Sequence, residues 1–218
     1  SDVYKRQGQD LGDRDPSKGE LPNLGETLKN YFNPNLRLIR DMPKPVVAAV
    51  NGAAAGAGAN IALACDIVLA ARSAKFLQAF ARIGLIPDAG GSWSLPRLVG
   101  PARARGLAML AEPIGAETAE EWGLIWKAVN DDSLMAEAQE TAMKLANGPT
   151  LGLALTKQAM LAAATNSLEE QLLLEEQVQA RAGASDDYRE GVSAFLEKRP
   201  ATVSYTHLRA HETYDQLV

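Results

Sequence analysis

The chain has 218 residues and a formal net charge of −5 at pH 7, and 46% of its residues are hydrophobic. This length can bury a sizeable core, and the acidic balance excludes a protein that coats nucleic acid, although it allows a local basic pocket. Cys65 is the only cysteine, which excludes an intrachain disulfide and favours the cytoplasm. No apolar run approaches the roughly 18 residues of a membrane span, so the sequence predicts no membrane partner.

The two ends of the chain differ from its middle. Residues 1–7 and 203–218 carry no periodicity that continues into their neighbours, and both histidines, His207 and His211, lie in the second segment. One interpretation is an ordinary pair of termini. We favour another, in which both segments are translated adapter sequence joined to a fragmentary gene. The rest of the chain then lacks histidine, which excludes a catalytic triad and a histidine-ligated metal, so we expect no metal site.

In chain order, the first element that we expect is a helix over residues 24–40, interrupted at Pro34 and preceded by a loop rich in Pro, Gly and Asp. A buried strand follows over 46–50. We then expect a short helix at 57–64, strands at 67–71 and 75–79, and a helix at 90–98. This alternation predicts a layered α/β core.

From Pro101 onward the pattern predicts helices almost throughout. The last three, at residues 150–164, 167–182 and 186–198, combine apolar stripes with charged faces. Apolar stripes on terminal helices need a partner.

Two segments carry the candidate chemistry, and the first is the turn Gly56-Ala57-Gly58, where an apolar strand leads through small residues into a helix. The small residues could serve only close helix–sheet packing. A dinucleotide loop is a poor match, because Ile61 stands where the third glycine is needed. The third interpretation is that uncovered backbone amides at this turn hold an anion.

The second segment places one carboxylate, Asp88, after Pro87 and before Ala89 and two glycines. Asp in this context is a common helix cap. It could equally stand at an open surface and transfer a proton, since backbone donors and a lone carboxylate suit enolate chemistry. Leu85, Ile86 and Trp93 could supply the apolar walls that raise the pKa of such a group.

Four stretches, GQDL from Gly8, NGAAAGAGA from Asn51, GLIPDAGGSW from Gly84 and YREGVSAFLEKR from Tyr188, resemble the crotonase (enoyl-CoA hydratase/isomerase) superfamily over roughly residues 8–199. The resemblance implies a spiral of ββα units with a C-terminal helical trimerisation region. It divides the chain into a leader (1–7), an N-terminally truncated core with the active site (8–130), a helical region (131–202) and a tail (203–218).

The resemblance also implies the site residues. Asp88 would be the catalytic acid, and the backbone amides of Gln9 and Ala57 would form the oxyanion hole. Further contacts to substrate and coenzyme A would come from Gly8, Asp10, Gly56, Gly58 and Lys198. Asn60 and Phe80 stand where hydratases carry two glutamates, and neither can act as a base, which favours isomerisation over hydration.

The implied function is an acyl-CoA isomerase of phenylacetate catabolism, converting ring-1,2-epoxyphenylacetyl-CoA to an oxepin thioester. It would need no cofactor beyond the coenzyme A of its substrate, and it would work as a trimer or hexamer. One alternative is a Δ3,Δ2-enoyl-CoA isomerase acting on linear chains. Others are a non-catalytic fragment and, more remotely, a dinucleotide oxidoreductase.

Overall fold

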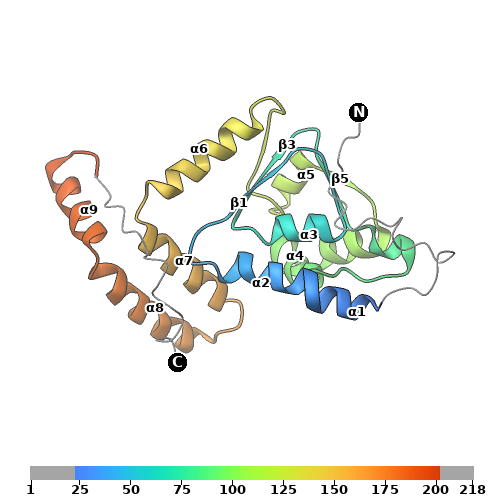
Figure 1. The fold of residues 1–218 in the computed structure, drawn as a ribbon, viewed down its shortest axis with the longest axis horizontal. Helices are drawn as coiled ribbons and strands as arrows, with labels where there is room; N and C mark the ends of the chain where they lie inside the picture. Colours follow the sequence, from blue (N-terminus) through green and yellow to red (C-terminus); the bar gives the residue numbers. More distant parts are fainter. Residues whose placement is uncertain (1–22, 202–218) are drawn as a thin grey trace. The chain divides into compact units, whose positions relative to one another are not determined.

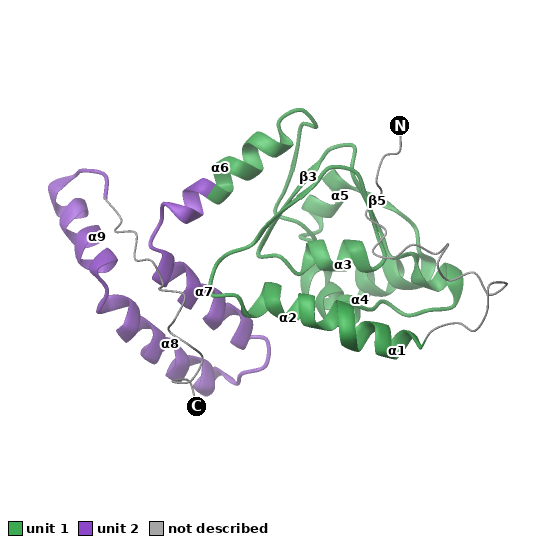
Figure 2. Cartoon of the chain, in the orientation of Figure 1, with its two compact units in different colours: residues 1–142 green, residues 143–218 purple. Residues whose placement is uncertain are grey.

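The computed structural model describes residues 23–201, and the chain divides into two compact units, residues 1–142 and 143–218 (Figure 2). The predicted leader and tail, and the predicted site residues Gly8, Gln9 and Asp10, lie outside the described residues. The first unit mixes strands with helices, whereas the second is helical (Figure 1). The predicted α/β core followed by a helical region is therefore confirmed, while the division at residue 130 stays a prediction.

One sheet of the first unit is wholly parallel, in the order β1 (Val47–Val50), β3 (Ile67–Ala71) and β6 (Lys127–Val129). Val50 pairs with Ala70, and Ala71 pairs with Val129. The central strand β3 is buried almost throughout, as expected of a parallel strand covered on both faces. β1 lies at the edge of the described sheet: Val50 is buried, and the other three residues are partly buried against the core, so the predicted buried strand is confirmed only in part.

The second sheet has the order β2 (Ala53–Ala55), β4 (Lys75–Leu77) and β5 (Ile114–Gly115). β2 and β4 are parallel, and β5 is antiparallel to β4. β4 ends two residues before the predicted strand does, because a 3₁₀ helix, η4 (Ala79–Ile83), begins there. β2 leads directly into the helix α3 (Ala57–Leu63), which starts where the sequence predicted it.

The first helical region is continuous through Pro34, so the predicted interruption was wrong. It consists of α1 (Leu24–Thr27), a π-helical turn η3 (Leu28–Phe32) and α2 (Asn33–Asp41). Proline lacks a backbone N–H and cannot make the usual bond to the residue four positions earlier. The turn immediately before Pro34 is wider than an α-helical turn, which accommodates the missing hydrogen bond. In this turn the amide of Asn33 donates to the carbonyl of Leu28, five residues back.

The prediction of helices almost throughout after Pro101 is confirmed for most of the described residues, but it missed the short strands β5 and β6. Each has at most three residues, which is too short to show a strand period. The helices of this region are α4 (Gly91–Leu110), which continues past Pro101 with a kink at Gly100, α5 (Ala116–Glu121) and α6 (Leu134–Ala146).

The second unit contains α7 (Thr150–Ala162), α8 (Leu168–Gly183) and α9 (Asp186–Glu197), close to the predicted bounds. Ser167 and Glu170 form a reciprocal capping box at the start of α8, and the Ser185 hydroxyl caps α9. Such caps satisfy amides that have no acceptor within the helix. Large apolar side chains nevertheless stay exposed on these helices, including Leu168, Met160 and Phe195.

The core of the first unit is built from small and branched residues. Phe76, Leu69 and Leu95 are among its largest fully buried side chains, and they bring together a strand of each sheet and α4. The Asp66 carboxylate accepts a hydrogen bond of 2.7 Å from the amide of Val46, just ahead of β1. Asp66 therefore has a structural role at the turn between α3 and β3.

Candidate active site

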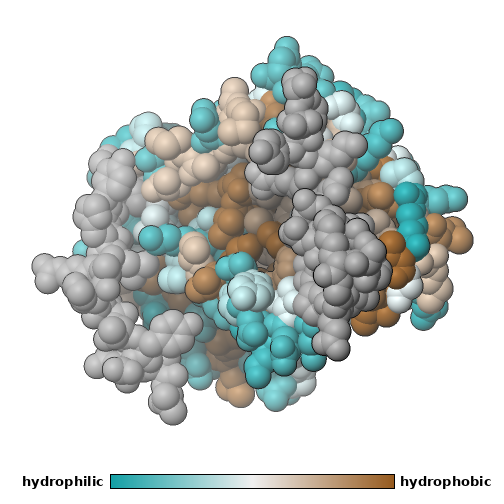
Figure 3. Space-filling view, turned by 45° about the vertical axis from the view of Figure 1, so that its right-hand side comes forward, coloured by the Kyte–Doolittle hydropathy of each residue, from teal (hydrophilic) through white to brown (hydrophobic). Residues whose placement is uncertain are grey.

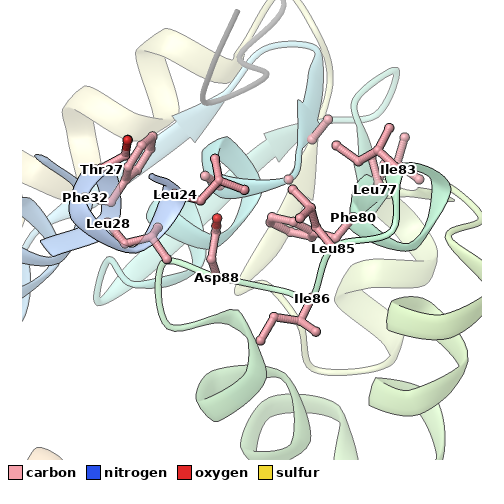
Figure 4. A pocket seen from close by; sticks show the side chains of 14 residues that line it. Leu24, Thr27, Leu28, Phe32, Leu77, Phe80, Ile83, Leu85, Ile86 and Asp88 are labelled. Atoms are coloured by element: carbon pink, nitrogen blue, oxygen red, sulfur yellow. The ribbon is translucent and has the colours of Figure 1, made fainter. Parts of the chain in front are cut away.

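A cavity of about 360 Å³ lies within the first unit, between the α1–η3 segment and the loop that follows η4. Among residues 23–201 its lining is almost entirely apolar, and Asp88 is the one ionisable side chain that these residues contribute (Figure 4). One wall is formed by Leu24, Leu28 and Phe32, and the opposite wall by hydrophobic side chains of η4 and its loop: Phe80, Ile83, Leu85 and Ile86. Apolar side chains also gather near the centre of the face drawn in Figure 3.

The Asp88 carboxyl group points into the space between these two walls (Figure 4). Its Oδ1 atom is buried and has no hydrogen-bond partner among the described residues. Burial raises the pKa of Asp88 above its ordinary value, and a hydrogen bond from its own backbone N–H opposes the shift only in part. A carboxylate with a raised pKa in a desolvated cavity is suited to take up and return a proton.

Asp88 does not cap α4, so the structural interpretation of this residue was wrong. The helix begins after Gly90, which has a left-handed backbone and makes no side-chain capping bond. Only the backbone carbonyl of Asp88 takes part, accepting a bond of 2.8 Å from the amide of Gly91. The carboxyl group is therefore left available to the cavity.

The buried amide side chain of Asn60 also donates to this carbonyl. Its Nδ2 atom donates to the carbonyl of Asp88 at 2.8 Å, and its Oδ1 accepts from Nε2 of Gln78 at 2.8 Å. Asn60 is 1% exposed and Gln78 3% exposed. Two residues that lie 28 and 10 positions before Asp88 in the sequence thus form a chain of hydrogen bonds that ends on its backbone.

The start of α3 supplies the other polar part of the site. Gly56 has φ 54° and ψ −131°, a conformation that glycine adopts readily, and it turns the chain from β2 into the helix. No side chain caps α3, so its first amides lack an acceptor within the helix. Gly56 and Ala57 both line the cavity, whereas Gly58 does not.

Two further sequence expectations concern side chains near the cavity. Phe80 is buried and lines it, so an aromatic ring occupies that part of the wall. Trp93 does not line the cavity, and the expectation that it forms a wall was wrong. Instead, the guanidinium groups of Arg40 and Arg97 lie over its ring, with their Cζ atoms 4.5 and 4.1 Å from the ring centroid.

Lys198 follows α9 in the second unit, where it is exposed and has φ 54°. Its predicted contact with coenzyme A stays a prediction. Among residues 23–201, no three acidic, histidine or cysteine side chains are grouped so that they could hold a metal ion. In the same part of the chain, no helix is both long and apolar enough to cross a membrane.

The sequence did not identify the α1–η3 wall or the Asn60–Gln78 chain. Leu24, Leu28 and Phe32 follow helical spacing, which is the pattern of any apolar helix face and does not show what the face covers. An Asn inside the small, apolar stretch of α3 was the one available signal for the hydrogen-bond chain, because a buried amide needs partners.

The sequence of this chain matches a known protein family. Residues 7–205 match the enoyl-CoA hydratase/isomerase family model. The chain is 57% identical over 194 residues to the 1,2-epoxyphenylacetyl-CoA isomerase of Escherichia coli K12, covering 88% of this chain and 74% of that protein. It is 55% identical over 193 residues to a Rhodobacter capsulatus protein named "Probable enoyl-CoA hydratase", with the same two coverages.

The structural comparison agrees with the sequence comparison. The crystal structure of an enoyl-CoA hydratase from Polaromonas sp. JS666 superposes with a TM-score of 0.83 at 37% identity, over 89% of this chain and 76% of that one. The chain therefore has the crotonase fold, as the sequence predicted. The two similar sequences carry the names of different reactions, so the choice between isomerisation and hydration depends on the residues of the site.

Proposed function

Because the chain belongs to the enoyl-CoA hydratase/isomerase family of enzymes, we propose that it is an acyl-CoA isomerase in which Asp88 transfers the proton. The observation that carries this proposal is the Asp88 carboxyl group itself. It lies in an apolar cavity, its Oδ1 atom has no partner among the described residues, and burial raises its pKa. A structural carboxylate is normally hydrogen-bonded when it is buried, whereas a proton-transfer group must keep a free oxygen.

In the proposed reaction, Asp88 removes a proton from the carbon next to the thioester carbonyl. The electron pair of the broken C–H bond moves into the carbonyl, so that negative charge develops on the thioester oxygen. The amide of Ala57, at the uncapped start of α3, would donate to this oxygen together with the amide of Gln9. One such donor typically contributes about 2.7–4 kcal/mol to the transition state.

The same carboxyl group then returns the proton to a carbon further along the substrate, and the product has the composition of the substrate. Hydration would need a second group that holds and activates water. The two positions at which the resemblance puts hydratase glutamates carry Asn60, whose amide is bonded to Asp88 and Gln78, and Phe80. Neither side chain can accept a proton from water near neutral pH, which supports isomerisation.

The similar Escherichia coli protein is named for 1,2-epoxyphenylacetyl-CoA, and the cavity walls of this chain suit an apolar acyl group of that kind. The proposed reaction is therefore the conversion of a ring-1,2-epoxyphenylacetyl-CoA to its oxepin thioester, as a step of phenylacetate breakdown in the cytoplasm. We further propose that Lys198 contacts coenzyme A and that the enzyme works as a trimer or hexamer.

A panel of thioesters in deuterated water tests this proposal. The full chain would be incubated with the ring epoxide, with a linear 3-enoyl-CoA and with a linear 2-enoyl-CoA, and the products identified by mass and NMR. We expect the ring epoxide to give an isomer, with deuterium incorporated or with the α-hydrogen transferred. Turnover of the 3-enoyl thioester alone would support the linear-chain alternative. Main products one water heavier than their substrates, or no turnover at all, would contradict an isomerase.

A further inference from the structure

The turn that carries Asp88 has an unusual backbone. Ala89, directly after it, has φ 45° and is 3% exposed, and Gly90 has φ 78°. A left-handed backbone is unfavourable for alanine, so this turn persists only where surrounding contacts hold it. The Asp88 carbonyl is one point at which it is held, because this oxygen accepts from the Gly91 amide and from Asn60 Nδ2, each at 2.8 Å.

The orientation of the Asn60 amide follows from its neighbours. A backbone carbonyl can only accept, so the nitrogen of Asn60 must face Asp88 and the oxygen must face Gln78. Gln78 then has to present its own nitrogen, and its Oε1 is left buried without a partner in the described part of the chain. Each side chain therefore donates to the next group: Gln78 donates to Asn60, and Asn60 donates to the Asp88 carbonyl. The acceptor that stays without a partner among the described residues is Oε1 of Gln78.

Gly91 shows how closely Asn60 is packed against this turn. A Cβ atom at position 91 would lie 2.2 Å from Asn60 Nδ2, 2.6 Å from its Cγ and 2.8 Å from its Oδ1. Each distance is far shorter than two non-bonded atoms allow. Any side chain at position 91 would therefore push the Asn60 amide away from the Asp88 carbonyl.

We propose that Asn60 is a positioning residue, which fixes the Asp88 peptide and thereby aims the Asp88 carboxyl group into the cavity. The inference rests on the proposed function of Asp88 and extends it to a side chain that does not line the cavity. Gln78 orients the Asn60 amide, and Gly91 leaves room for it. Two hydrogen bonds on the carbonyl oxygen of Asp88 limit the rotation of this peptide, and they thereby limit the positions that the carboxyl group can take.

The experiment measures exchange of the α-hydrogens of phenylacetyl-CoA with deuterated water, catalysed by the full chain at thioester concentrations up to saturation and followed across pH. In Asn60→Ala we expect the maximal rate to fall about 10- to 100-fold, as for a misplaced catalytic group, with KM within about twofold of wild type. The acidic limb of the rate profile should move to lower pH, because a carboxyl group turned toward solvent loses part of the burial that raises its pKa.

Asn35→Ala is the matched control. Its Nδ2 atom also donates to a backbone carbonyl at 2.8 Å, that of Tyr31, but it is exposed and does not line the cavity. The exchange rate of this variant and the acidic limb of its pH–rate profile should stay as in wild type.

Gln78→Met removes the donor to Asn60 and keeps a side chain of similar length. It should lower the rate in the same direction as Asn60→Ala, and it tests the proposal if Asn60→Ala does not fold.

A double-mutant cycle separates positioning from general packing. Gly91→Ala should lower the rate about as much as Asn60→Ala. The double variant should be no slower than either single variant, because the three atoms that clash with the new Cβ are absent from it. Additive losses of rate would contradict the proposal.

Asp88→Asn distinguishes the failure of this inference from the failure of the proposed function. If Asp88→Asn abolishes exchange while folded Asn60→Ala keeps the wild-type rate and acidic limb, Asn60 is not a positioning residue and the proposed function stands. If Asp88→Asn exchanges at the wild-type rate, the proposed function is wrong and the role of Asn60 is overturned with it.

Discussion

The carboxyl group of Asp88 combines two properties that seldom occur together at a structural site. It faces an apolar cavity, and one of its oxygens is buried without a hydrogen-bond partner among the described residues. Burial disfavours its charged form, so the ionised group destabilises the folded state. Catalytic groups often lower the stability of the folded state in this way, because activity requires an environment that is unfavourable for the charged group.

The raised pKa of Asp88 predicts how the free energy of unfolding depends on pH. The folded-state pKa of Asp88 is raised above its ordinary value of 3.8, so its contribution to stability is fully present below the ordinary pKa and is lost as pH rises through the raised one. Asparagine does not titrate. Asp88→Asn should therefore unfold at a higher temperature than wild type at about pH 7, and the difference should narrow as pH falls through the raised pKa of Asp88 toward its ordinary value.

Calorimetry of both chains between about pH 3 and pH 8 measures this difference. Glu121→Gln, which removes an exposed carboxylate of α5, is the control and should leave the unfolding temperature close to wild type at each pH. An Asp88→Asn variant that is less stable than wild type at neutral pH would show that the carboxylate is stabilising, contrary to its environment.

At the scale of residues, the sequence predicted Asp88 and Ala57, and both line the cavity. It predicted them because Pro-Asp-Ala-Gly-Gly and the small-residue turn are local patterns, complete within a few positions. The contacts of Asn60 with Gln78 and Asp88 join residues 18 and 28 positions apart. No local pattern encodes such a contact, so it could be seen only once the chain had folded.

At the scale of elements, the π-helical turn η3 contributes residues to the cavity wall. Pro34 prevents a regular helix, the preceding turn widens, and two of its residues, Leu28 and Phe32, line the cavity. Single π turns inside α-helices often lie at functional sites. The sequence showed the proline and predicted a break, whereas the structure continues the helix through a wider turn.

Phe32 and Tyr31 are adjacent aromatic residues of η3 with different surroundings. Phe32 lines the cavity, whereas Tyr31 is 68% exposed and does not. Phe32→Ala should raise KM for an aryl-acetyl thioester roughly tenfold, because a wall of the acyl site loses a ring, while Tyr31→Ala should change KM little. Steady-state kinetics of the two variants tests this difference. Equal effects on KM would show that the acyl group does not reach η3.

The strands β5 and β6 show why the sheets could be predicted only in part. β3 has five apolar residues, three of them branched, and was predicted with its observed bounds. β6 has three residues and β5 has two, and their pairing with β3 and β4 brings together parts of the chain that are far apart in sequence. Such short strands are stabilised by the sheet that they join rather than by their own propensity.

At the scale of the whole molecule, the chain consists of an α/β unit that contains the described cavity and a helical unit. The helical unit exposes several large apolar side chains, among them Leu168, Leu173 and Phe195, as the apolar stripes of its sequence predicted. This surface is consistent with the proposed homo-oligomer, which sedimentation of the full chain would measure. The proposed chemistry, however, depends on the first unit.

The most direct test of the account is exchange of the α-hydrogens of phenylacetyl-CoA in deuterated water, compared between wild type and Asp88→Asn by NMR. The assay detects proton removal without requiring that the natural acyl group be known. We expect wild type to incorporate deuterium at the α carbon, and we expect Asp88→Asn to retain its fold while exchanging at least about 100-fold more slowly. Exchange by folded Asp88→Asn at the wild-type rate would show that another group removes the proton, which would contradict the central claim.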